Sequence, residues 1–149
     1  MRLLAIIFII FCSFDSMAQY DWDSKNWDKK SLGFGCGFSG QMTKPVSQIS
    51  KLLTEGNFKE LRQLLNSDLT SYQYLSTFVL EKLSDNGDLK LTEMELKKID
   101  QIKNSEQTVP ICSGCTYWDE RPLRELFDVK TNTIISYNAE YWFERIYKK

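Results

Sequence analysis

Apolar residues recur at helical spacing through the middle of this 149-residue chain, and this pattern constrains its fold more than any other feature. Thr43 precedes the first such segment as a predicted cap, Pro45 lies in its first turn, and Gly56 follows as a stop signal. Asn57 then caps a second segment, which ends at the polar turn 66–68. Short helices joined by short turns pack as antiparallel neighbours. We therefore predict a mainly α-helical fold, either a small bundle or a short α-solenoid of helical hairpins.

Two further helices follow from the same spacing. The third runs from about Ser71 to Leu83, with its apolar residues turned inward. The fourth begins at Thr92, because the Thr-x-x-Glu pattern that ends at Glu95 is a capping box. This fourth helix is expected to bury Met94, Leu96, Ile99 and Ile102.

The helical spacing ends near residue 105, and the rest of the chain is expected to be irregular, with some β-structure. Residues 122–127 predict one or two helical turns. Residues 133–137 are β-branched enough to predict a strand. Asn138 is then expected to cap a final helix, with a β-hairpin as the alternative.

Residues 1–18 are typical of a cleaved export signal. Arg2 precedes an unbroken apolar run over residues 3–12, and residues 16–18 form a small-x-small cleavage site. A run of this length is too short to span about 30 Å of hydrocarbon as a helix. We therefore expect a secreted or periplasmic protein that begins near Gln19, with no membrane insertion after cleavage.

The mature chain divides into an arm and a single domain. Residues 19–41 are aromatic and then glycine-rich, and four glycines near the end of this stretch disfavour regular structure. Residues 42–149 form the predicted helical domain, with helical hairpins over 42–104 and the irregular part over 105–149.

Three cysteines remain after the signal: Cys36 in the glycine-rich run, and Cys112 and Cys115 in a Cys-x-x-Cys pattern. In an oxidising compartment, the favoured interpretation is a structural disulfide from Cys36 to one of the other two. Such a bond closes a loop of about 80 residues, which the chain-entropy argument values at about 4.5 kcal/mol. The flanking glycines let the backbone at Cys36 approach a packed surface closely. The sequence leaves open which partner Cys36 takes.

The same cysteines allow two alternatives to a structural disulfide, a redox pair and a metal site. A redox pair of Cys112 and Cys115 would need a lowered thiol pKa, for which Arg121 is a nearby positive charge. No thioredoxin-like βαβ pattern surrounds this pair, however. A metal site would combine the three thiolates with Asp119 or Glu120. Neither a metal nor any other cofactor is favoured.

The segment between the third and fourth predicted helices resembles an EF-hand calcium loop over residues 84–95. Ser84 replaces the usual first aspartate, and Leu89 replaces the usual glycine at position 6. Ordinary turn chemistry followed by the capping box explains the same residues. The resemblance implies the ligand set Ser84, Asn86, Asp88, Lys90, Thr92 and Glu95.

Residues 45–103 resemble HEAT-like helical pairs. A short helix, a polar Asn-Ser-Asp turn and a longer apolar helix follow one another over residues 57–83. This resemblance implies protein binding or scaffolding rather than catalysis.

The amino-acid composition excludes several classes of function. The chain contains no histidine, which excludes Ser-His-Asp and Cys-His catalysis and histidine-ligated metals. A formal net charge of −1 provides no basic field for nucleic acid. We therefore expect a non-enzymatic protein that binds another protein or stabilises an envelope assembly. The alternatives are a thiol–disulfide or metal-handling protein and, second, a sugar-binding module. The aromatic residues for sugar or partner contact are Tyr20, Trp22 and Trp27, or Tyr117, Trp118, Tyr141 and Trp142.

Overall fold

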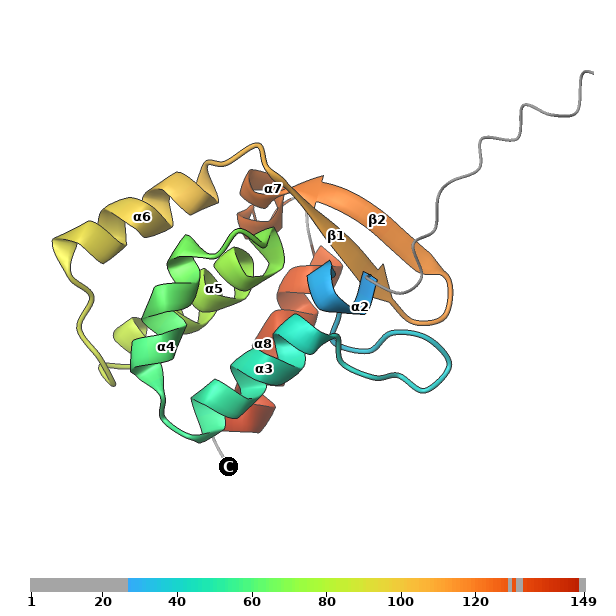
Figure 1. The fold of residues 1–149 in the computed structure, drawn as a ribbon, viewed down its shortest axis with the longest axis horizontal. Coiled ribbons are helices and arrows are strands. Elements are labelled where there is room, and N and C mark those ends of the chain that lie inside the picture. Colours follow the sequence, from blue (N-terminus) through green and yellow to red (C-terminus); the bar gives the residue numbers. More distant parts are fainter. Residues whose placement is uncertain (1–26, 129, 131–132, 148–149) are drawn as a thin grey trace, which may run out of the picture.

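Helices dominate the computed structural model, which describes residues 27–128, 130 and 133–147 (Figure 1). The mainly α-helical prediction is therefore confirmed, whereas the predicted export signal over residues 1–18 lies outside the described residues. The elements are α2 (Trp27–Lys30), α3 (Lys44–Thr54), α4 (Phe58–Gln63), the 3₁₀ helix η1 (Leu64–Asn66), α5 (Thr70–Asp85), α6 (Glu93–Lys103), β1 (Thr108–Ser113), β2 (Tyr117–Pro122), α7 (Leu123–Phe127) and α8 (Thr133–Tyr147). None of the helices in this described part is long and apolar enough to cross a membrane.

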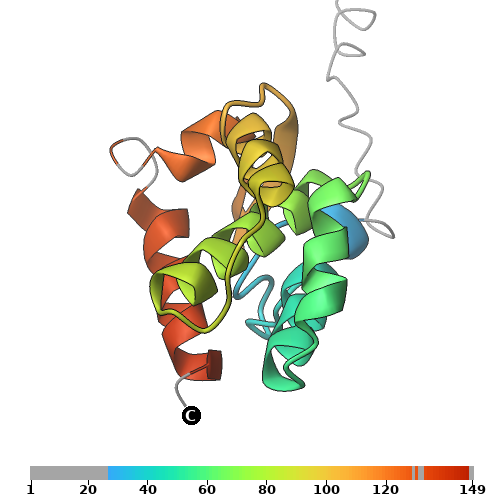
Figure 2. The same ribbon diagram turned by 90° about the vertical axis from the view of Figure 1, so that its left-hand side faces the viewer.

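The helix α5 lies at the centre of the fold. It packs against α3, α4 and α6, and in Figure 2 it lies between α8 and α4 with α6 above it. Its inward residues Leu75, Val79, Leu80 and Leu83 are fully buried. Tyr74 is buried as well, so the hydrophobic core forms around this one helix.

The predicted helix starts at Asn57 and Thr92 are found in the structure, but the cap at Thr43 differs. The predicted cap at Asn138 is wrong, because this residue lies inside α8. Asn57 accepts a hydrogen bond from the Glu60 backbone N–H at 3.3 Å, as an N-cap does. Thr43 occupies the N-cap position of α3, yet its hydroxyl makes no cap hydrogen bond. Instead the Thr43 Oγ1 lies 3.2 Å from both the backbone N and the backbone O of Gly33. This residue therefore joins α3 to the arm.

Two further predictions are wrong: the strand over residues 133–137, and the burial of Met94 and Leu96 in the fourth helix. Residues 133–137 form the start of α8 rather than a strand, because Ile135, Ala139 and Phe143 share one buried helical face. Burial along that face outweighs the β-preference of the branched side chains.

In α6, Ile99 and Ile102 are buried as predicted, but Met94 is 82% and Leu96 is 52% exposed. The first turns of α6 project past the body of the protein in Figure 1, so they have no core to pack against.

The β1–β2 hairpin holds the arm in position through backbone hydrogen bonds. The two strands are antiparallel, with Thr108 opposite Pro122 and Ser113 opposite Tyr117. The arm runs beside β1 in parallel, and the Leu32 backbone N–H donates to the Pro110 carbonyl at 2.8 Å. The arm therefore behaves as a third, irregular strand at the inner edge of the hairpin.

We expect core and surface leucines of these helices to differ sharply. Leu75→Ala should lower the free energy of unfolding by about 2–5 kcal/mol, because it leaves a cavity in the centre of the core. The matched change Leu96→Ala should cost about 0.5 kcal/mol or less, because this side chain is half exposed. Urea unfolding measures both, and equal losses would contradict the burial pattern.

Candidate functional site

A disulfide between Cys36 and Cys112 fixes the arm to β1. The two Cα atoms are 5.8 Å apart, and both residues are buried. The sequence left two partners open for Cys36, and the structure places Cys112 against it. Gly33 is required at this joint, since a Cβ on it would lie 2.1 Å from the Cys36 Sγ and 2.4 Å from the Cys112 Sγ.

The remaining cysteine, Cys115, is free and exposed in the turn between β1 and β2. The preceding Gly114 has a φ of +58°, which favours glycine. Its backbone N–H donates to the Gly35 carbonyl at 2.8 Å, and its carbonyl accepts from the Gly37 N–H at 2.9 Å. The hairpin turn and the arm are thus joined on both sides of the disulfide.

A groove lies beside this disulfide-bonded region. It has a volume of about 290 Å³ and is partly open to solvent. The arm, the end of β1 and one face of α8 supply its walls. Its lining residues are Phe34, Gly35, Met42, Ser113, Asn138, Tyr141, Trp142 and Arg145.

Trp142 forms the fixed wall of the groove. Its indole Nε1–H donates to the Ser50 Oγ at 2.8 Å, and the Ser50 hydroxyl donates to the Val46 carbonyl at 2.7 Å. The Phe34 ring packs against the indole at a centroid distance of 5.5 Å. These contacts fix the orientation of the indole ring.

The α8 side of the groove continues as an exposed apolar surface. Ile134, Tyr137 and Tyr141 recur at helical spacing and are 59%, 70% and 59% exposed. We call these three residues the α8 stripe. Exposed apolar side chains are common singly, but a row of them beside a groove is a candidate contact surface.

The predicted aromatic residues divide into two groups. Tyr20 and Trp22 lie outside the described residues. Trp27 packs edge-to-face on Trp118 at 5.0 Å, where it covers the hairpin, and Tyr117 is 42% exposed at the hairpin's end. Tyr141 and Trp142 form the second group and line the groove. Sequence reasoning missed Phe34, Asn138 and Arg145 as groove residues. The signal for two of them was the 138, 141, 142, 145 spacing on a helix that the sequence divided into a strand and a shorter helix.

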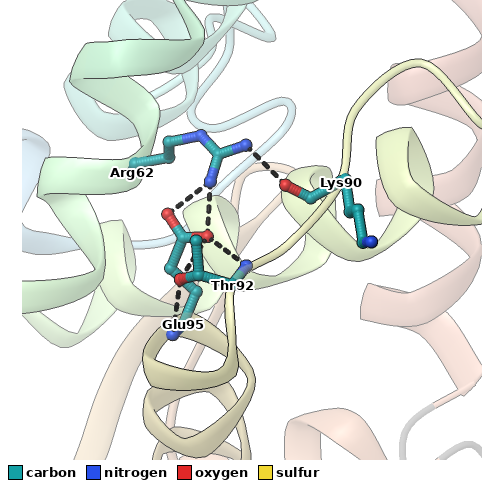
Figure 3. Close-up of polar contacts among 4 residues, drawn as sticks. All are labelled: Arg62, Lys90, Thr92 and Glu95. Carbon is teal, nitrogen blue, oxygen red and sulfur yellow. Dashed lines mark hydrogen bonds and ion pairs between the residues drawn. The ribbon is translucent and has the colours of Figure 1, made fainter.

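A second polar cluster occupies the predicted calcium loop (Figure 3). Arg62 forms an ion pair with the Glu95 carboxylate and donates to the Lys90 carbonyl at 3.0 Å. Thr92 and Glu95 complete the predicted capping box, with the Thr92 N–H donating to the carboxylate at 2.8 Å. Ser84 belongs to α5. The guanidinium group thus holds two of the groups that the resemblance assigned to calcium, and calcium binding stays a prediction.

The charge of Glu95 is stabilised by this cluster. Burial would raise the pKa of Glu95, but the hydrogen bonds from Arg62 and Thr92 outweigh it and hold the pKa below the usual value. The carboxylate therefore stays ionised at neutral pH and stabilises the start of α6.

The metal-site alternative finds no support among the described residues, which hold no group of three or more Cys, Asp or Glu side chains suited to a metal ion. Cys36 and Cys112 are not thiolates while the disulfide joins them. The predicted fourth ligands lie on β2: the hydrogen bond from Arg121 lowers the pKa of Asp119, and Glu120 is exposed.

No family model, curated protein or solved structure matches this chain.

We expect the disulfide to dominate stability. Replacing Cys36 and Cys112 together by serine should lower the free energy of unfolding by about 2–5 kcal/mol, because the loop between them is long. The control Cys115→Ser should change it by about 0.5 kcal/mol or less, because this thiol is exposed and free. Urea unfolding measures both changes.

Mass mapping of the wild-type protein, alkylated after mild dithiothreitol treatment, should find Cys36 still bonded to Cys112. Cys115 should be the one alkylated residue among these three cysteines. A readily reduced bridge between Cys112 and Cys115 would contradict the structural disulfide.

The Arg62–Glu95 cluster predicts a pH-dependent contribution to stability. Because the folded-state pKa of Glu95 is lowered, its contribution is present above the ordinary pKa of 4.5 and is lost as the pH falls through the folded-state value. Glu95→Gln should therefore cost about 1–2 kcal/mol at pH 7, and the difference from wild type should shrink below about pH 4.5.

The matched control is Glu93→Gln, which removes an exposed carboxylate from the same first turn of α6. Thermal unfolding at several pH values compares the two variants. A loss for Glu95→Gln that stays constant down to acid pH would contradict the ion pair as its cause.

Proposed function

We propose that this protein is an exported, non-enzymatic binding protein that holds a protein partner along the groove and the α8 stripe. The observation that carries the proposal is the continuity of the exposed Ile134, Tyr137 and Tyr141 with the groove wall formed by Trp142. Tyrosine and tryptophan are enriched where interfaces gain most of their binding energy.

The rigidity of the groove supports this proposal. The disulfide ties one wall to β1, and the hydrogen bond from Trp142 to Ser50 orients the other. A surface that is already ordered avoids the entropy cost of ordering side chains on binding. A groove of this kind suits recognition better than a chemical step, for which the chain has no histidine to act as a base.

Export is supported by two independent features. The pattern of residues 1–18 is typical of a signal peptide, and the buried disulfide is of a kind that persists in oxidising compartments. The HEAT-like resemblance of residues 45–103 stays a prediction and implies the same class of function, protein binding.

Thiol–disulfide exchange is the second candidate function. The observation that favours it is the exposed Cys115, three positions beyond Cys112 in the same hairpin. Its thiolate would attack the Cys112 sulfur and release the Cys36 thiolate, so that the exchange needs no external oxidant. The dithiothreitol and mass-mapping experiment described above separates exchange from a structural bridge. A sugar-binding module, the further alternative, would use the same groove.

A photo-crosslinking amino acid at position 137 or 141 tests the protein-binding proposal in the organism that makes this protein. Both positions should give the same adduct, because both lie on the exposed face of α8. The control position 59, exposed on α4, should give none.

The partner is identified from the adduct by mass spectrometry and the complex is rebuilt from the two purified proteins. Ile134→Glu should then weaken the complex by about tenfold, because it places a charge within an apolar contact. Lys59→Glu is the matched surface control. Equal crosslinking at positions 59 and 137, or a rebuilt complex insensitive to Ile134→Glu, would contradict the proposal.

A further inference from the structure

We infer that the partner presents an acidic peptide segment, whose carboxylate pairs with Arg145 while a neighbouring apolar side chain packs between Phe34 and Tyr141. This inference rests on the proposed function, that a protein occupies the groove, and it adds the chemistry of the occupant.

The charge of the groove favours a carboxylate ligand. Among the described residues that line it, Arg145 alone is charged, and no carboxylate contributes to the walls. Within the described part of the chain, no ion pair joins Arg145 to an acidic side chain. Glu140, on the same helix, lines a different cavity and pairs with Lys82 at 2.5 Å. No acidic side chain of the described residues thus occupies the guanidinium, and its paired N–H donors match a carboxylate.

The other lining residues describe the rest of the ligand. Asn138, Ser113 and the Tyr141 hydroxyl are neutral hydrogen-bonding groups of the kind that bind a peptide backbone. The rings of Phe34 and Tyr141 are aromatic and suit an apolar side chain, with Trp142 packed behind Phe34. A volume of about 290 Å³ lies at the lower end of the range for ligand pockets, so the groove takes a short piece of chain rather than a large cofactor.

The α8 stripe favours a peptide over an acidic sugar, which would offer Arg145 the same carboxylate. Beyond the groove the stripe continues through Tyr137 to Ile134, both more than half exposed. An aliphatic side chain such as Ile134 has no ring face to stack on a sugar, whereas it packs well against apolar side chains of a peptide. The helix α8 lies at the outer edge of the protein in Figure 2 and the stripe residues are more than half exposed, so a peptide can follow the helix from the groove to the stripe.

Fluorescence anisotropy with two labelled hexapeptide pools tests the inference. Both pools are blocked at their ends and carry a fixed central pair, Glu-Phe in one and Gln-Phe in the other, within randomised small residues. Wild-type protein should prefer the Glu-Phe pool by about tenfold, about 1.4 kcal/mol, and the preference should weaken as salt rises. Arg145→Gln should abolish the preference.

The matched control is Lys97→Gln, which makes the same charge change at an exposed position on α6. It should leave both affinities within about twofold, the range of an ordinary surface substitution. Equal binding of the two pools, absence of binding by both, or equal loss in the Arg145→Gln and Lys97→Gln variants would overturn the inference.

Two further readouts separate the inference from the proposed function. Binding of oligogalacturonate that depends on Arg145, without binding of either peptide pool, would overturn the peptide and support the sugar-binding alternative. If the Glu-Phe preference fails but the crosslink at position 137 is specific, only the pairing of a partner carboxylate with Arg145 is overturned. Loss of both the preference and the crosslink would overturn the proposed function as well.

Discussion

The disulfide between Cys36 and Cys112 is the constraint on which the functional end of this protein depends. It fixes the arm to β1, and the arm supplies one wall of the groove. The bond requires a glycine at position 33, because any side chain there would collide with both sulfurs. The Thr43 hydroxyl then ties the same glycine to the start of α3. Covalent and hydrogen-bonded joints thus converge within a few residues and hold an otherwise irregular segment in place.

In the rest of the structure, burial of apolar side chains around α5 provides stability, and polar contacts on the neighbouring helices set their orientation. The core around Leu75 and Leu80 stabilises the helices by removing apolar surface from water. Polar contacts set orientation instead: Arg62 and Glu95 fix the start of α6 (Figure 3), and Ser50 orients the Trp142 ring. Such contacts contribute modest net stability, but an unmet buried indole N–H would be costly, which restricts how α8 packs on α3.

The helices over residues 43–103 could be predicted because their caps and turns are local. The box of Thr92 and Glu95 satisfies backbone groups within one helical turn, so its effect is visible in four residues of sequence. The error at Met94 arose because spacing alone does not show whether a neighbouring surface exists to cover a helical face. The error at residues 133–137 arose because β-preference is weak beside burial of residues such as Ile135 and Phe143.

By itself, the sequence determined the helical class, the positions of the turns, the export signal pattern over residues 1–18 and the exclusion of histidine chemistry, because these depend on residue type and local spacing. Only the tertiary structure decided that Cys36 pairs with Cys112 and leaves Cys115 free. It also decided that the arm, the end of β1 and one face of α8 meet to form a groove. The physical reason is that long-range contacts are selected by how whole surfaces pack, which no short segment encodes.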